Sequence, residues 1–180
     1  MARSEFEDEY DAALEGEEHK ILGSALLTEE IRELEPAEPI LIGPDASVLD
    51  AVKAMKDGHQ GAVLVVDGGK KTGKLLGIFS ERDLVTRVVG TGKDVKATKI
   101  REVMTPDPET VTADDLICIA LNRMAVKGYR NIPVLDSKGQ AVGIVFARHF
   151  ATFVSGLFPE AVLNLPPTRE LKHPEMKESG

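Results

Sequence analysis

The sequence predicts a mixed α/β (α+β) fold made of two copies of one β-α-β-β-α unit. The main observation is an internal repeat, in which residues 39–67 align without a gap with residues 108–136, 69 positions later. A second block, residues 77–83, aligns with residues 143–149 after the intervening loop has shortened by three residues. Neither copy can cover its own sheet, so we expect the two copies to bury their sheets jointly.

Each copy contains a helix with one apolar face. Four apolar residues per copy follow the spacing i, i+3, i+4, i+7 that places them on one side of a helix. Ser47 precedes the first of these helices and Asp50 lies three residues later, which is the pattern of a capping box. The apolar residues are Val48, Ala51, Val52 and Met55 in the first copy and Ile117, Ala120, Leu121 and Met124 in the second.

Two apolar runs around a Gly-containing turn follow each helix and predict a β-hairpin. The runs cover residues 62–66 and 75–79 in the first copy and residues 132–135 and 141–145 in the second. A second helix is expected after each hairpin, near residues 81–89 and 148–155.

The segments outside the repeats are predicted with less regular structure. Thr28 should cap a short leading helix over residues 29–34 that packs beside the first repeat. We expect the acidic start and the polar chain after Pro166 to be loose, and the apolar stretch 153–165 to cover the core. The predicted boundaries are 1–27 for the acidic tail and leader, 28–100 for the first repeat, 101–158 for the second and 159–180 for the C-terminal tail.

Composition excludes several classes of protein. The net charge is −8, and residues 1–20 hold eight acids against Arg3 and Lys20, so no basic stripe exists that would bind nucleic acid. No run of about 20 apolar residues could span a membrane, and no signal pattern opens the chain, so we expect a cytoplasmic protein. Cys118 is the only cysteine, and a buried or interface thiol is favoured over a catalytic one.

The repeat resembles a tandem pair of cystathionine-beta-synthase (CBS) domains, often called a Bateman module. The resemblance covers about residues 28–158 and is carried by Gly77-Ile-Phe-Ser-Glu-Arg-Asp-Leu84, Arg101-Glu-Val-Met-Thr105 and Arg130-Asn-Ile-Pro-Val-Leu-Asp136. It implies two repeats packed with pseudo-two-fold symmetry and a homodimer shaped as a disc. It also implies a regulatory, ligand-sensing module that binds an adenosine nucleotide between the repeats and signals to a separate partner protein.

The residues after the first hairpin have the chemistry that an adenosine nucleotide requires. A ribose presents two neighbouring hydroxyls, and the carboxylate of Asp83 can accept both hydrogen bonds. A phosphate is bound by helix N-terminal N–H groups, hydroxyls and cations, which Ser80, Arg82 and, from the other repeat, Arg130 can supply. An adenine needs an apolar slot, and the candidates are Ile78, Val111, Tyr129 and Ile132.

The resemblance adds residues from the second repeat. In the family, the ribose-binding Asp of one repeat faces the linker and the first hairpin strand of the other repeat. Arg82 and Arg130 together favour a phosphorylated ligand over S-adenosylmethionine. We expect AMP, ADP or ATP as the ligand rather than S-adenosylmethionine or NADH. Carried onto this sequence, Asp83 would face Met104, Thr105, Thr110, Val111, Tyr129, Arg130 and Pro133.

The second copy departs from this pattern. Phe146 stands at the position of Ser80, and His149 stands at the position of Asp83. A phenyl ring cannot contact phosphate as a hydroxyl does, and a neutral imidazole cannot accept two ribose hydroxyls. We therefore expect one competent site per chain. A pH-sensing role for His149 is conceivable, but a gap-filling role is favoured.

Other interpretations of the same residues stay open. Ser80 can simply cap a helix with Asp83 in its first turn, and the chain can be a structural dimerisation scaffold with a vestigial cleft. An enzyme is not expected, because the histidines have no metal-ligand spacing and no nucleophile lies beside a base. The loop 68–74 resembles a nucleotide triphosphatase phosphate loop, but Leu75 follows its lysine where Ser or Thr is needed.

Overall fold

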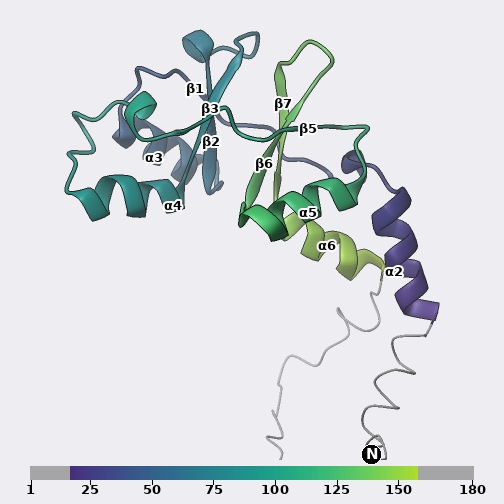
Figure 1. Cartoon of the computed structure of the whole chain (residues 1–180). Helices are drawn as coiled ribbons and strands as arrows, with labels where there is room; N and C mark the ends of the chain where they lie inside the picture. Colours follow the sequence, from purple (N-terminus) through teal and green to yellow (C-terminus); the bar gives the residue numbers. More distant parts are fainter. Residues whose placement is uncertain (1–16, 158–180) are drawn as a thin grey trace, which may run out of the picture.

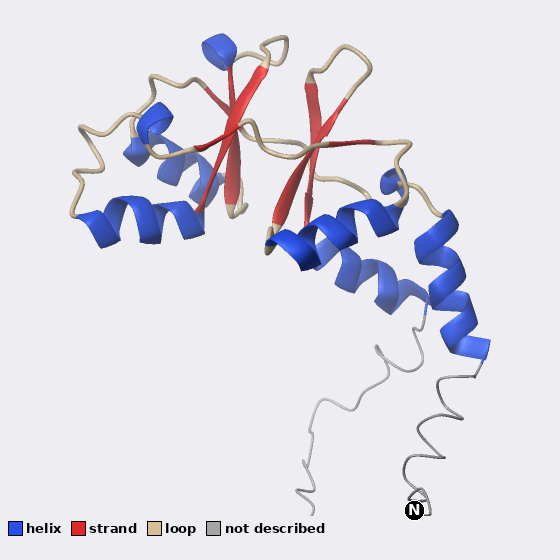
Figure 2. Ribbon diagram, in the orientation of Figure 1, coloured by secondary structure: helices blue, strands red, loops and turns tan. Residues whose placement is uncertain are grey.

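The computed structural model describes residues 17–157, with side chains from residue 21 onward. The expected loose ends, residues 1–16 and the chain from residue 158, lie outside the described residues. Two small sheets stand side by side at the centre of the molecule, and helices cover their outer faces (Figures 1 and 2). The strand order is β1-β2-β3-β4 in one sheet and β5-β6-β7 in the other. The expected mixed fold of two β-α-β-β-α units is confirmed.

The first repeat follows the predicted order of elements closely. β1 pairs in parallel with β2, and β2 pairs antiparallel with β3, with Ala62 opposite Ser80. The helix after β1 begins with the predicted capping box, in which Asp50 N–H donates to Ser47 Oγ and Ser47 N–H donates to Asp50 Oδ2. The bounds are β1 Leu41–Ile42, α3 Val48–Asp57, β2 Ala62–Val66, η2 Asp67–Gly69 and β3 Leu75–Ser80.

The helix after β3 is present but changes character along its length. It starts as one α-helical turn, α4 (Glu81–Asp83), continues as a π-helix, η3 (Leu84–Val88), and ends as a 3-10 turn, η4 (Val89–Thr91). The predicted helix over residues 81–89 is therefore correct in place, although periodicity alone could not reveal the π segment. Short π segments are rare and occur frequently at functional sites.

The second repeat has the same order of elements. β5 pairs in parallel with β6, and β6 pairs antiparallel with β7, with Asn131 opposite Phe146. Gly128 ends α5 with a φ of 72°, a left-handed conformation that favours glycine. The bounds are β5 Val111–Thr112, α5 Ile117–Lys127, β6 Asn131–Leu135, β7 Ala141–Phe146 and α6 Ala147–Leu157.

The leading segment differs from the sequence prediction. Residues Glu17–Thr28 form an α-helix, α2, so part of the expected loose leader is regular. Thr28 ends this helix rather than capping the next one, and its hydroxyl donates to the carbonyl of Ser24. The following helix is a single 3-10 turn, η1 (Ile31–Leu34). Of the apolar stretch expected to cover the core, only the part up to Leu157 lies within the described residues.

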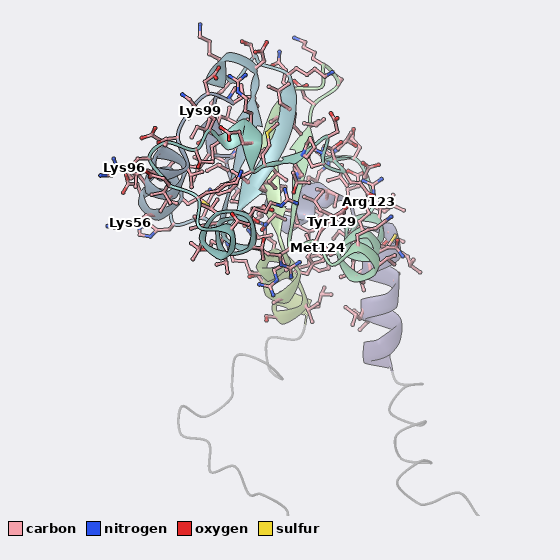
Figure 3. The ribbon with its side chains drawn as sticks, turned by 60° about the vertical axis from the view of Figure 1, so that its left-hand side comes forward. Lys56, Lys96, Lys99, Arg123, Met124 and Tyr129 are labelled. Carbon is pink, nitrogen blue, oxygen red and sulfur yellow. The ribbon has the colours of Figure 1, made fainter. Side chains whose placement is uncertain are left out.

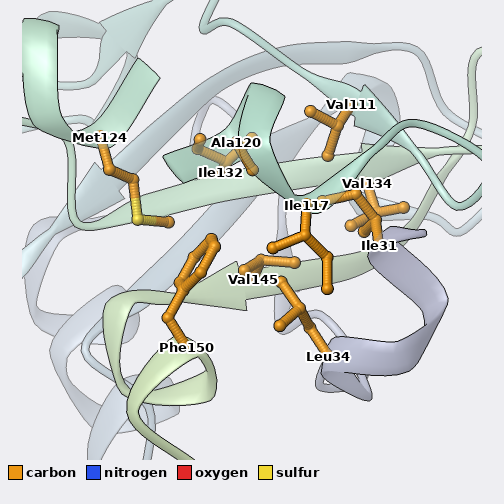
Figure 4. Packing of buried hydrophobic residues seen from close by; sticks show 10 residues of the cluster. All are labelled: Ile31, Leu34, Val111, Ile117, Ala120, Met124, Ile132, Val134, Val145 and Phe150. Carbon is orange, nitrogen blue, oxygen red and sulfur yellow. The ribbon is translucent and has the colours of Figure 1, made fainter. Parts of the chain in front are cut away.

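The 3-10 turn η1 packs in the second repeat, not beside the first as predicted. Ile31 and Leu34 are buried in a cluster with Ile117 and Val145, and the Ile31 N–H donates to the carbonyl of Asp115. Figure 4 shows this core, with Ile31 and Leu34 lying against residues from α5 and the second sheet. The segment before the first repeat therefore completes the core of the second.

The linker between the repeats, in turn, completes the core of the first repeat. The 3-10 turn η5 (Ile100–Glu102) places Ile100 and Val103 in the core of the first repeat. The chain then forms β4 (Thr105–Pro106), which pairs antiparallel with β3. In the second repeat the equivalent edge contact is made by Ala37, which exchanges backbone hydrogen bonds with Ile144. The two repeats thus exchange their leading segments with approximate two-fold symmetry.

The inner faces of the two sheets meet in a shared core, as predicted. β2 is buried on both faces, because alternate residues point to opposite sides of a strand. Val63 and Val65 face the helices of the first repeat, whereas Leu64 and Val66 face the second sheet and pack in one cluster with Ile144. This joint core fixes the position of one repeat against the other.

We predict that Ile31→Ala destabilises the whole described fold. Ile31 is fully buried in a core built mainly by residues more than 80 positions later in the chain. Removing a buried Ile side chain costs about 2–5 kcal/mol of the free energy of unfolding. Urea denaturation measures this loss. Ile21→Ala is the matched control, because Ile21 is half exposed and its truncation should cost less than about 0.5 kcal/mol. An Ile31→Ala cost as small as the control contradicts the exchanged arrangement.

Candidate functional site

A cavity of about 1150 Å³ lies between the two repeats. One wall is the C-terminal end of β3 with the start of α4, and the opposite wall is the turn from α5 into β6 with the start of α6. β4, the edge strand contributed by the linker, lies along a third side. Figure 3 shows Lys56 on the first repeat and Tyr129 on the second, and both residues line the cavity. Neither repeat alone would enclose this space.

Ser80 and Asp83 form a capping box at the wall of the cavity. Asp83 Oδ2 accepts hydrogen bonds from the Ser80 backbone N–H (3.0 Å) and from Ser80 Oγ (2.7 Å). The Asp83 N–H donates in turn to Ser80 Oγ at 3.4 Å. Asp83 is buried, at 8% exposure, which is unusual for a carboxylate. The capping interpretation of this motif is therefore confirmed as local structure, and it also holds a buried carboxylate in a defined position.

The second oxygen of Asp83 is held by Arg87, one helical turn later. Arg87 Nε lies 3.3 Å from Asp83 Oδ1. Arg87 Nη1 also donates to the carbonyls of Val103 (3.2 Å) and Met104 (2.7 Å) in the linker. Arg87 was not among the residues predicted for the site, although its spacing of four residues from Asp83 is that of an ion pair on one helix face.

The cavity is lined by more cations than acids, in a chain whose net charge is −8. Arg82 reaches across to the second repeat, where its Nη1 donates to the Gly128 carbonyl at 3.1 Å. On the second repeat, three cations line the wall at Lys127, Arg130 and Arg148. The acids are Glu81, Asp83, Asp107 and Glu109, and the cations are Lys56, Arg82, Arg87, Lys127, Arg130 and Arg148.

Apolar surface alternates with these charges. Ile78, which pairs with Thr105 of the linker strand, lines the cavity, and Val52, Met55 and Leu84 extend the apolar lining on the first repeat. Tyr129, at 38% exposure, faces the cavity from the turn before β6. A space with one buried carboxylate, several cations and an apolar lining can hold a ligand that is partly aromatic and partly anionic.

The structure brings seven of the twelve predicted site residues to the cavity: Ile78, Ser80, Arg82, Asp83, Thr105, Tyr129 and Arg130. The other five do not line it. Val111 and Ile132 are buried in the core of the second repeat, and Pro133 is buried in β6. Thr110 lines a smaller, separate pocket near the hairpin turns. Val111 and Ile132 therefore cannot form the expected adenine slot in this arrangement.

Met104, the fifth of these, packs against the core of the first repeat beside Gly77. A Cβ added to Gly77 would lie 2.5 Å from Met104 Sδ and 2.8 Å from the Thr105 backbone carbonyl oxygen, so glycine is needed for the linker strand to approach this closely. Met104 thus reaches the site through its backbone carbonyl, which accepts from Arg87, and not through its side chain.

The equivalent position in the second repeat is filled by side chains. Phe146 is buried, and the Arg148 guanidinium stacks on its ring with Cζ 4.1 Å from the ring centroid. His149 makes an edge contact with the same ring, with a centroid separation of 5.5 Å. Burial lowers the pKa of His149, the nearby charge of Arg148 lowers it further, and Glu35 opposes the shift. This half of the cavity therefore has no carboxylate and no hydroxyl at the positions of Asp83 and Ser80.

Within residues 17–157, no group of three His, Cys, Asp or Glu side chains is arranged to hold a metal ion. In the same part of the chain, no helix has the length and apolar character needed to cross a membrane.

Comparison with known proteins identifies the repeat. The family model described as "CBS domain" matches residues 31–90 and 100–156. The meiotically up-regulated gene 70 protein of Schizosaccharomyces pombe is 33% identical over 65% of this chain and 16% of its own length. A mitochondrial CBS domain-containing protein of Arabidopsis thaliana is 36% identical over 56% of this chain and 49% of its own length. The chain thus spans less than two thirds of these curated relatives.

Solved structures have the same fold. A CBS-domain protein of Burkholderia ambifaria is 26% identical, with a TM-score of 0.64, and the match covers 77% of this chain and 98% of that one. A CBS domain protein of Pyrobaculum aerophilum complexed with AMP is 19% identical, with a TM-score of 0.63 over 71% and 97%. A CBS domain pair in complex with 5′-methylthioadenosine and S-adenosyl-L-methionine is 22% identical, with a TM-score of 0.58 over 68% and 97%. The last two structures are less than 25% identical to this chain, so the comparison with them shows a shared fold alone.

The lowered pKa of His149 predicts a pH-dependent stability. The unfolded chain binds a proton on this imidazole at a higher pH than the folded chain does, so stability falls as the pH drops below the ordinary His value of about 6.5. Urea denaturation at about pH 7.5 and about pH 5.5 should show a larger loss for the wild type than for His149→Gln, which cannot titrate. Equal losses in the two proteins would show that His149 does not contribute.

Proposed function

Because this chain belongs to the CBS-domain family and carries two copies of the domain, we propose that it is a regulatory module that binds an adenosine nucleotide between its repeats. The observation that carries the proposal is the cavity itself: a buried carboxylate, Asp83, lies in a space lined by six cations, in a chain that is acidic as a whole. Such a space favours an anionic ligand that also carries hydrogen-bond donors.

Asp83 is suited to a ribose. Burial leaves its carboxylate few competing waters, and ribose hydroxyls are donors that a carboxylate accepts strongly. Ser80 and the start of α4 lie directly beside it. A sugar held at Asp83 would therefore place its 5′ substituent near Ser80 and Arg82.

The cations are suited to phosphate. Arg82 and Arg130 lie on opposite walls of the cavity, and Lys127 and Arg148 extend the positive charge on the second repeat. Arginine binds phosphate oxygens with two parallel hydrogen bonds, which an uncharged or cationic ligand would not use. This charge supports AMP, ADP or ATP over S-adenosylmethionine, and Tyr129 with Ile78 can contact the base. The AMP complex of the Pyrobaculum aerophilum protein, which has the same fold, agrees with this choice.

We propose one competent site per chain. At the positions of Ser80 and Asp83 the second repeat has Phe146 and His149, whose rings contact each other and whose neighbour Arg148 stacks on Phe146. A ligand in this half would find no acceptor for a ribose diol. The half would instead contribute Arg148 as a cation to the single site.

Nucleotide binding would be signalled to a separate partner protein, and no catalytic step is part of the proposal. Exposed apolar residues on helices, Val85, Val89 and Val126, support a homodimer that pairs through its helices into a disc. Sedimentation as a strict monomer at micromolar concentration contradicts that dimer.

The second candidate function is a dimerisation scaffold with a vestigial cleft, which the degenerate second repeat favours.

We predict that AMP, ADP or ATP raises the melting temperature of the protein and that guanosine nucleotides do so much less. A ligand at about a hundredfold excess over Kd that binds only the folded state adds about 2.7 kcal/mol. For a chain of this size that corresponds to a shift of about 5–10 °C in a thermal melt. Asp83→Ala should abolish most of the shift, and His149→Ala should leave it nearly intact.

Asp50→Ala is the matched control for Asp83→Ala. Both changes remove the carboxylate of a Ser-x-x-Asp capping box, but Asp50 caps α3 outside the cavity. Each variant loses one capping box, whereas only Asp83→Ala should lose the response to AMP. No shift with any adenosine ligand, including S-adenosylmethionine and NADH, supports the scaffold instead.

A further inference from the structure

The arginines of the described chain divide into two groups. Within residues 21–157, one group forms ion pairs with carboxylates, and its members are Arg32, Arg87, Arg101 and Arg123. Arg82, Arg130 and Arg148 form no such pair with a carboxylate of these residues, and all three line the cavity between the repeats. Guanidinium groups that gather without acids are suited to an anion.

Two of these arginines are brought together by the pairing of β6 with β7. Asn131 at the start of β6 lies opposite Phe146 at the end of β7. The Ala147 N–H then donates to the Arg130 carbonyl at 2.9 Å. Arg130 and Arg148 therefore lie at adjoining strand ends, on the wall of the cavity that the second repeat contributes.

The third arginine reaches the same wall from the first repeat. Arg82 Nη1 donates to the Gly128 carbonyl, which belongs to this wall, at 3.1 Å. Residues 127–131 and 146–148 form the wall, and they contain Lys127 as a further cation and no acid. The charge opposite Asp83 is therefore of one sign.

Phe146 fixes the position of Arg148 on this wall. The Phe146 ring is buried, and Arg148 Cζ lies 4.1 Å from the ring centroid. This contact uses the charge of the guanidinium and none of its N–H donors, which remain free for phosphate oxygens. Phe146 stands where the first repeat has Ser80, so the residue that removes a second ribose site also supports a cation.

We propose that this wall is a polyphosphate subsite, through which the site prefers ATP to AMP; the inference rests on the proposed nucleotide function. With the ribose at Asp83 and the first phosphate near Ser80 and Arg82, the second and third phosphates extend towards Arg130 and Arg148. AMP carries about two negative charges and ATP about four, so AMP leaves part of the wall without a counter-charge. The cavity of about 1150 Å³ exceeds the roughly 300–1,000 Å³ of most ligand sites and has room for the longer chain.

Calorimetric titration of the whole chain with AMP, ADP and ATP tests the subsite, in a buffer that contains EDTA and no divalent cation. The wild type should bind ATP about tenfold more tightly than AMP, because the added phosphates bond to charged donors. Arg148→Met keeps an unbranched side chain beside Phe146 but removes the charge. It should reduce the ratio of the Kd for AMP to the Kd for ATP to about threefold or less. The ratio is the readout, since any change at the ribose or the base affects both nucleotides.

Two controls make the ratio specific. Arg101→Met removes the same charge from an arginine that pairs with Asp45 and does not line the cavity, so it should keep the wild-type ratio. Phe146→Leu removes the ring that holds Arg148 and should lower the ratio. Phe150→Leu is its control, because Phe150 is buried in the core of the second repeat and does not line the cavity. It should reduce stability and leave the ratio unchanged.

The outcomes separate this inference from the function on which it rests. If AMP binds and ATP binds no more tightly, the polyphosphate subsite is refuted and the proposed function stands. If Arg148→Met keeps the wild-type ratio, or if Arg101→Met lowers the ratio as much, the preference for ATP comes from overall charge and its assignment to this wall is refuted. If no adenosine nucleotide binds the wild type, the proposed function is refuted, and the subsite with it.

Discussion

The arrangement of this protein depends on the exchange of two short segments between its repeats. Ile31 is buried in the second repeat and Ile100 in the first, and each is fully shielded from water. Burying an aliphatic side chain of this size stabilises the fold by about 1.5–3 kcal/mol, so both segments contribute substantially to the core they enter. The segment after Ile31 pairs with the edge of the second sheet through Ala37, and the segment after Ile100 forms β4 at the edge of the first sheet. Each repeat therefore depends on the segment that precedes the other, and the cavity between them has walls that are held in place from both sides.

This constraint explains how a site can be built from both repeats together. The end of β3 supplies Ser80 and Asp83, the turn before β6 supplies Tyr129 and Arg130, and the exchanged linker supplies the third side. The approximate symmetry would give two equivalent halves, but side-chain chemistry makes them different. A carboxylate with a hydroxyl lines one half, whereas Phe146, whose ring contacts His149, lines the other. The exchanged linker also contacts Asp83 through Arg87, so the segment that holds the repeats together is bonded to the candidate site.

Much of this could be predicted from the sequence, because the signals are local. The apolar face of α3, its capping box and the continuous apolar run of β2 are all visible in the sequence. The exchange was missed because η1 and η5 are single turns with no periodic pattern, although Ile-Arg-Glu occurs at both Ile31 and Ile100, 69 positions apart. Ile132 lies in β6, whose central residues are buried on both faces, so its sequence gives no signal of which face meets the cavity. Val111 lies in a two-residue strand, which is too short for a pattern to show where its side chain is buried. The contacts of Arg87 with the linker depend on tertiary structure, so only its spacing from Asp83 was visible.

The central claim is that one half of the cavity, and only one, binds an adenosine nucleotide. Isothermal titration calorimetry of the whole chain with AMP measures this directly, because the stoichiometry counts competent halves. The account predicts one AMP per chain, since Asp83 has no counterpart beside Phe146. Two AMP molecules per chain would show that the Phe146 half is competent as well, and the absence of any binding heat at several temperatures would contradict the nucleotide site altogether.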